Sequence, residues 1–150
     1  MRAVVQRVTH ATVNIDQKPY SQIGEGLLVL LGIAFEDTVA DMEWLVKKIA
    51  SLRVFDDDNG VMNLSVKDIG GEVMVVSQFT LMASYKKGNR PSYIKAASPE
   101  VSIPLYEQFC RTMSDEMGKK VATGVFGAHM DIDFVNSGPV TICMDTKNKE

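Results

Sequence analysis

Cysteine is scarce in this 150-residue chain, which contains only Cys110 and Cys143. The two residues lie far apart, show no Cys-x-x-Cys spacing and sit within apolar patterns. A metal site built on paired thiolates is therefore excluded, and neither a disulfide nor a cysteine nucleophile is favoured. Free cysteine is usually a small buried residue, so we expect both side chains to be buried and inert, with no bound metal.

Conventional catalytic sequences are also missing. The chain has no Gly-x-Ser-x-Gly elbow, no His-Glu-x-x-His helix and no Gly-Lys-Ser/Thr phosphate loop. Its two histidines, His10 and His129, have no obvious nucleophile beside them in the sequence. We interpret both as structural residues. A lone histidine is usually structural, and a catalytic triad is established only by the spatial geometry of its members. If the protein is an enzyme, we expect it to work without an acid–base dyad and without a cofactor.

Long hydrophobic runs are absent as well. No stretch of about eighteen apolar residues occurs, and the first residues lead directly into a strand-like pattern. We therefore expect a cytoplasmic protein that does not contact the membrane. Hydrophobic residues make up 45% of the chain and charged residues 23%, which is typical of globular proteins. A chain of this length suits one domain, and we predict that residues 1–150 form it.

What is present is a regular alternation of strand and helix patterns. Residues 3–16 are rich in β-forming residues, and 11–16 alternate apolar and polar side chains. The run 27–33 is apolar throughout and should be a central strand. Further strands are expected at 72–81, at 121–125 and beyond 130. Helical spacing marks 38–53 and 98–117, and Gly118 ends the second helix. The predicted fold class is α/β (α+β): a mixed, curled β-sheet with two main helices packed on it, in the order β-β-α-β-α-β-β.

Acidic residues are missing between Glu72 and Glu100, although the whole chain carries a net charge of −3. The same stretch contains Lys86, Lys87 and Arg90 among aromatic, glycine and proline residues. Such a loop can contact phosphates through its cations and stack aromatic rings on unpaired bases. The alternative, given equal weight, is a solvated surface loop, because charge clusters of this size are common.

Polar residues occupy the end of the strand expected at 72–81. Strand alternation would direct Ser77 and Phe79 to one face of the sheet and Gln78 and Thr80 to the other. Side chains alone could then not bring all four residues into one pocket. Two interpretations stay open: a functional site next to the basic loop, or a strand end whose hydroxyls satisfy backbone groups.

Gly138 and Pro139 interrupt an apolar alternation that is otherwise typical of strands. Proline lacks the donor that a sheet ladder needs, and glycine adopts backbone angles that other residues avoid. These residues taken alone favour a hairpin turn within the segment 136–141. The alternative is a presented backbone, in which a cis Gly-Pro bond directs two neighbouring carbonyl oxygens the same way.

Four separated motifs occur together in the chain. They are Ser77-Gln78-Phe79-Thr80-Leu81, Gly88-Asn89-Arg90-Pro91-Ser92, Phe126-Gly127-Ala128-x-Met130 and Asn136-x-Gly138-Pro139-Val140-Thr141. With the opening Met1-Arg2-Ala3-Val4-Val5-Gln6-Arg7-Val8, they resemble D-aminoacyl-tRNA deacylase of the bacterial and eukaryotic type over essentially the whole chain. The family more often has aspartate where this chain has Ser137, so a carboxylate role there is not expected.

The resemblance implies a homodimer that hydrolyses the ester joining a D-amino acid, or glycine, to the 3′-terminal adenosine of tRNA, with no DNA partner. In such an enzyme the cis Gly138-Pro139 dipeptide would enter the partner subunit's site and reject L-amino acids, and Arg7 would orient it. The residues that would line the pocket are Phe126, Gly127, Ala128 and Met130. Those that would contact tRNA are Lys86, Lys87 and Arg90.

Two catalytic routes are compatible with this resemblance. Thr80 is the nucleophile proposed for the family, but no general base is recognisable near it. In the second route the terminal 2′-hydroxyl of tRNA assists the attack, and backbone amides near Phe79 and Thr80 stabilise the oxyanion, with Ser77 and Gln78 beside them. The missing dyad favours this second route. The non-enzymatic alternatives are a non-catalytic tRNA-binding module and a structural interaction protein.

Overall fold

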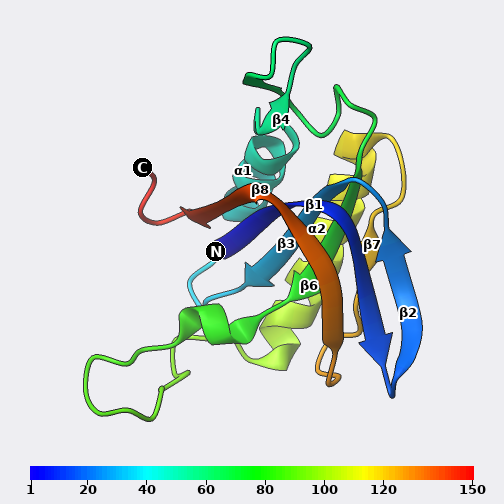
Figure 1. Ribbon diagram of the computed structural model, residues 1–150. Coiled ribbons are helices and arrows are strands. Elements are labelled where there is room, and N and C mark those ends of the chain that lie inside the picture. The colour runs from blue at the N-terminus through cyan, green and yellow to red at the C-terminus, as the bar shows by residue number, and fades with distance from the viewer.

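A curled, mixed β-sheet with two helices packed on it forms the protein (Figure 1). The computed structural model describes residues 1–150. The sheet contains β1 (Arg2–Ile15), β2 (Lys18–Ile23), β3 (Gly26–Gly32), β6 (Glu72–Ser77), β7 (Ala122–Thr123) and β8 (Asp131–Asp145). The remaining elements are α1 (Val39–Ala50), the hairpin β4 (Phe55–Asp56) and β5 (Met62–Leu64), the 3-10 turn η1 (Phe79–Met82) and α2 (Pro99–Met117). The α+β class is confirmed, and the structure adds β2 and the small hairpin to the predicted order.

Strand β1 connects the parts of the sheet. Its first half pairs antiparallel with β3 and its second half with β2, while β8 pairs with both halves. Beyond β3 the strands β6 and β7 continue the sheet in parallel. The far edge returns towards β2, where the Ser21 hydroxyl donates to the Thr123 carbonyl at 2.6 Å. The sheet is therefore nearly closed. It can curl in this way because β1 pairs with β3 along its first half and with β2 along its second half.

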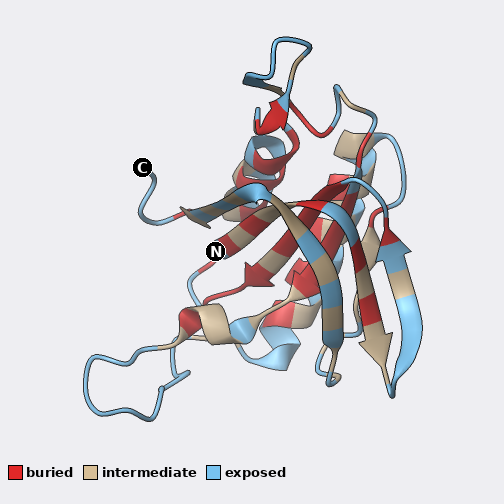
Figure 2. Ribbon diagram, viewed as in Figure 1, coloured by how far each residue is buried: buried red, intermediate tan, exposed pale blue.

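Strands β3 and β6 are buried on both faces, as the continuous apolar runs predicted (Figure 2). Val29 and Val75 belong to the larger core, which α1 and α2 cover. Leu28 and Met74 belong to a second core inside the curled half of the sheet. Residues at the end of these two strands consequently have rigid support on both sides.

Both predicted helices are present. Thr38 caps α1, accepting a hydrogen bond from the Asp41 amide in a capping box, and the helix ends at Ala50 rather than at position 53. Helix α2 follows Ser98 and ends at Gly118, whose φ of 67° lies in the left-handed region. Neither helix combines the length and hydropathy needed to cross a membrane.

The strand predicted to reach position 81 ends earlier, at Ser77. The Gln78 amide still donates to the Leu31 carbonyl at 2.7 Å, and η1 then turns the chain across Gly32. A Cβ at Gly32 would lie 2.9 Å from the Leu81 Cβ, so the absent side chain makes room for the turn. The predicted strand alternation across Ser77–Thr80 is therefore wrong.

The hairpin turn favoured for Gly138 and Pro139 is also wrong. β8 is one continuous strand, and both of its halves pair antiparallel with β1. The register shift places Ser137–Val140 opposite the single residue Arg7, which makes this segment an enlarged bulge. Gly138 and Pro139 are exposed in it, and the peptide bond between them is cis. The interruption in the sequence pattern thus marks a bulge within one strand.

The two cysteines differ in environment. Cys110 is partly buried on α2, and burial raises the pKa of its thiol to about 11, so the thiolate is scarce at neutral pH. Cys143 is exposed on β8, contrary to the prediction. Successive side chains of a strand point to opposite faces, and Cys143 lies on the face opposite Ile142 and Met144, which pack on the larger core.

Candidate functional site

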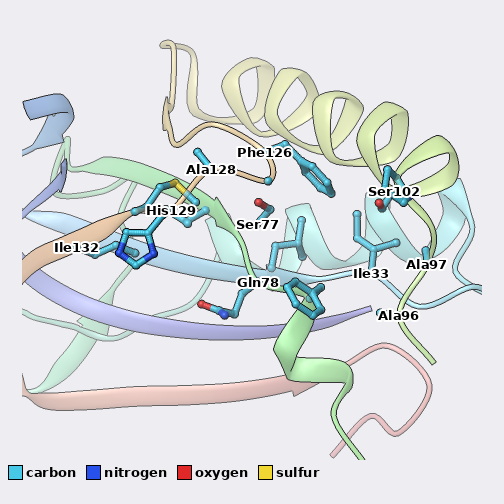
Figure 3. Close-up of a pocket in the computed structure, with 16 residues that line it drawn as sticks. Ile33, Ser77, Gln78, Ala96, Ala97, Ser102, Phe126, Ala128, His129 and Ile132 are labelled. Atoms are coloured by element: carbon cyan, nitrogen blue, oxygen red, sulfur yellow. The ribbon is translucent and has the colours of Figure 1, made fainter. Parts of the chain in front are cut away.

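A cavity of about 480 Å³ opens at the end of β6. It lies between the start of η1, the loop before β8, the first residues of β8 and the beginning of α2 (Figure 3). Ten of its sixteen lining residues are hydrophobic, which limits the water that can gather around a bound group. The polar side chains in the wall are Ser77, Gln78, Ser102 and His129.

Two of the predicted segments meet in this cavity. Ser77, Gln78 and Phe79 line one side, because the chain leaves the strand at Ser77. The other side contains Phe126, Gly127, Ala128 and Met130. Thr80 is not part of the wall, and its hydroxyl accepts a hydrogen bond from the Gln78 side-chain amide.

The loop before β8 is held in place by close packing. The Phe126 ring packs on Tyr106 of α2 with 5.8 Å between ring centroids, and the Tyr106 hydroxyl donates to the Val75 carbonyl at 2.8 Å. A Cβ at Gly124 would lie 2.4 Å from the Met130 sulfur, so the absent side chain lets the Met130 side chain pack against the backbone here. The loop, α2 and β6 therefore form one rigid wall.

The basic loop begins beside the cavity. Ser84 and Ser92 exchange two backbone hydrogen bonds at its neck, and the Ala97 amide donates to the Ile33 carbonyl where the loop returns to the wall. The Phe79 and Tyr93 rings meet edge to face at 5.1 Å and join the loop to the cavity rim. The tip projects away from the sheet (Figure 1). At this tip Lys86, Lys87 and Arg90 are exposed and outside the cavity wall.

Arg7 contacts the bulge of β8 directly. Its Nε donates to the Ser137 carbonyl at 3.1 Å and its Nη1 to the Val54 carbonyl at 2.7 Å. The side chain is 12% exposed, so these contacts are largely shielded from water. Gly138 and Pro139 themselves do not line the cavity of their own chain.

The site contains no acid–base pair and no cluster of three metal-ligating side chains. His129 is 93% exposed at the rim and faces Asp131 at 3.6 Å. The histidine is thus not held beside any hydroxyl of the wall. Chemistry in this cavity depends on positioning and on backbone donors unless the bound molecule brings its own reactive group.

Several residues of the wall were not predicted. Ile33 follows β3, which runs parallel to β6, so the ends of the two strands lie together at one edge. A correct assignment of that parallel pair would have placed Ile33 in the wall. Ser102 lies on α2, whereas Ala96 and Ala97 precede the helix and pair with Ala34 and Ile33 after β3. No local pattern signals these contacts.

The cavity contains residues of two of the four motifs that carry the family resemblance in the sequence. The family described as D-Tyr-tRNA(Tyr) deacylase matches residues 4–145. The chain belongs to this family. Among relatives of this deacylase, the D-aminoacyl-tRNA deacylases of Bacteroides thetaiotaomicron and Parabacteroides distasonis are each 61% identical over 150 residues, covering 100% of both chains.

Two solved structures share the fold of this chain. This deacylase superposes on the "c-Myc DNA Unwinding Element Binding Protein" with a TM-score of 0.90 and 41% identity, covering 97% of this chain and 98% of the other. A probable eukaryotic D-amino acid tRNA deacylase gives a TM-score of 0.83 at 16% identity, covering 95% and 97% of the two chains. The second match shows a shared fold.

Proposed function

We propose that this protein hydrolyses the ester of D-aminoacyl-tRNA and of glycyl-tRNA and releases the free amino acid and tRNA. The supporting observation is that two motif segments, 77–79 and 126–130, form opposite walls of one cavity. Residues 1–150 act as a single deacylase domain in the cytoplasm, where aminoacyl-tRNA is used. The proposal requires neither a metal nor another cofactor.

The start of η1 supplies the groups for charge stabilisation. The backbone amides of Phe79 and Thr80 donate to no acceptor within the chain, because the first hydrogen bond of the turn comes from the Leu81 amide. Unpartnered amides beside a cavity wall can stabilise the negative charge that develops on an ester carbonyl under attack. Gln78 and Ser77 border the same position and can orient the substrate.

Substrate assistance accounts better for the chemistry than a threonine nucleophile. Thr80 lies outside the wall, its hydroxyl is held by Gln78, and no base contacts it. An unactivated hydroxyl is a weak nucleophile. The 2′-hydroxyl of the terminal adenosine is adjacent to the ester and can promote the attack of water.

Selection against L-amino acids is assigned to Gly138 and Pro139, acting in a second copy of the chain. The dipeptide is exposed and absent from its own cavity, and Arg7 holds the bulge that carries it. β8 pairs with β1 alone, so its outer edge is free for a homodimer contact. Backbone carbonyls inserted into the partner's cavity would occupy the space of an L side chain yet tolerate many D-amino acids and glycine.

The first prediction tests the activity itself. Incubation with matched D- and L-aminoacyl-tRNA is expected to release the D-amino acid rapidly and to leave the L ester at its spontaneous rate. Ester loss is measured by acid precipitation of labelled aminoacyl-tRNA. Background hydrolysis of both esters would refute the enzymatic assignment.

The second prediction concerns the basic loop. Replacing Lys86, Lys87 and Arg90 by alanine should weaken tRNA binding. It should also lower the slope of log Kd against log salt concentration by about 2, because each lost phosphate contact on a single strand contributes about 0.7. The charge-matched control replaces the exposed Lys18, Lys47 and Lys120, which lie outside the basic loop. Equal salt slopes for the two triple variants would show that the loop does not contact the phosphates of tRNA.

A non-catalytic nucleic-acid-binding module is the second candidate. The exposed cations at the loop tip and the name of the similar "c-Myc DNA Unwinding Element Binding Protein" favour it. Competition between tRNA and DNA of equal length separates the candidates, because the deacylase proposal expects no specific DNA binding. Salt-sensitive binding without D-specific ester loss would support the module.

A further inference from the structure

The side chain of Asn136 connects the two ends of the β8 bulge. It is the last residue paired with β1 before the bulge, opposite Val8, and its side chain is partly buried. Its Nδ2 donates to the Val140 carbonyl at 2.9 Å, on the far side of Gly138 and Pro139. The same nitrogen donates to the Arg7 carbonyl at 3.2 Å. One amide group thus joins both ends of the bulge to the opposite strand.

The arrangement makes Arg7 a common anchor for the bulge. The backbone carbonyl of Arg7 accepts from Asn136, and its guanidinium donates to the Ser137 carbonyl. The residues on both sides of the exposed dipeptide are therefore connected to Arg7 of β1: Ser137 directly, and Val140 through the Asn136 side chain. A bulge in which four residues face one has few ladder hydrogen bonds of its own, so side-chain contacts must limit its conformations.

We infer that Asn136 is a positioning residue for chiral selection: its amide spans the bulge and sets the pose in which Gly138 and Pro139 are presented to the partner's cavity. The inference rests on the proposed selection function. Asn136 does not line the cavity of its own chain. Its removal should therefore change discrimination between D and L substrates more than it changes turnover of the D substrate.

The experiment compares Asn136→Ala with Asn14→Ala. Asn14 is also a partly buried asparagine of the β1–β8 pair, but its side chain makes no hydrogen bond. Single-turnover kcat/KM is measured for matched D- and L-aminoacyl-tRNA, together with Tm. We expect Asn136→Ala to lower the D/L ratio about tenfold, the effect of losing one to two net hydrogen bonds. Asn14→Ala should retain the wild-type ratio.

A second measurement separates positioning from general stability. Asn136→Leu fills similar volume without donors, and hydrogen exchange of the amides of residues 137, 138, 140 and 141 should accelerate in it while the amides of β3 keep their protection. A wild-type D/L ratio in both Asn136 variants would overturn the inference, whatever their Tm. If the wild-type protein itself hydrolyses both esters equally, the selection function fails, and that result is read from the wild-type arm alone.

Discussion

Replacement of Gly138 by alanine is expected to reduce kcat/KM for D-aminoacyl-tRNA by about a hundredfold or to abolish D/L discrimination. Gly138 has a φ of 120°, a conformation that L residues rarely adopt. An added Cβ would lie 2.8 Å from the Arg7 Nη2 and 2.9 Å from a Val140 methyl group. The new methyl group would therefore displace either the Arg7 side chain or the bulge, each by enough to misplace the dipeptide.

Gly118→Ala is the matched control for this change. Gly118 also has a positive φ, 67°, but a Cβ there would meet no atom within 4 Å. The control should cost about 1 kcal/mol of folding free energy, the usual penalty for a left-handed L residue, without altering D/L discrimination. A Gly138→Ala protein with wild-type kinetics for both substrates would show that the bulge has no part in selection.

Subunit mixing shows in which cavity the dipeptide acts. Gly138→Ala and Gln78→Ala chains are each expected to be impaired, the second because Gln78 lines the cavity. If the dipeptide acts in the partner's cavity, a mixed dimer contains one cavity in which both features are intact. Activity should then recover towards half of the wild-type value on mixing. No recovery in verified mixed dimers would place both features in the same chain.

Removal of the terminal 2′-hydroxyl of the substrate is the second change with a large expected effect. D-aminoacyl-tRNA ending in 2′-deoxyadenosine should be hydrolysed roughly 10²- to 10⁴-fold more slowly, the range of a lost proton-transfer contribution. The physical reason is that no side chain in the cavity forms an acid–base pair. Rapid-quench hydrolysis at saturating enzyme isolates the chemical step, and binding of the deoxy substrate is measured separately.

Thr80→Ala is the complementary change on the protein side. Because the Thr80 hydroxyl is outside the cavity wall and bonded to Gln78, its loss should lower the hydrolysis rate by less than tenfold. Wild-type tRNA binding combined with complete loss of hydrolysis would instead identify Thr80 as the nucleophile. Normal turnover of the deoxy substrate would exclude the role of the 2′-hydroxyl.

The sequence was a reliable guide where the relevant interactions are local. The start of α1 after Thr38 and the left-handed terminator Gly118 follow from short-range backbone chemistry. The burial of β3 follows from its uninterrupted apolar run. The motif segments could likewise be recognised without coordinates, because their spacing along the chain is itself a pattern.

Local reasoning failed where partners distant in the sequence decide the backbone. Whether β6 continues past Ser77 depends on the room that Gly32 leaves for η1. Whether Gly138 and Pro139 form a hairpin depends on β1, which pairs with both halves of β8 and keeps them in one strand. Propensity alone carries no information about either neighbour.

The sequence by itself therefore determined the fold class, both helices, the central strands and membership of the deacylase family. Only the tertiary structure decided that Ser77, Gln78 and Phe79 share one cavity while Thr80 does not. It also showed that Arg7 and Asn136 hold an exposed bulge between them. Periodicity is set by neighbours along the chain, whereas a cavity and a bulge are set by contacts between strands that the chain brings together only on folding.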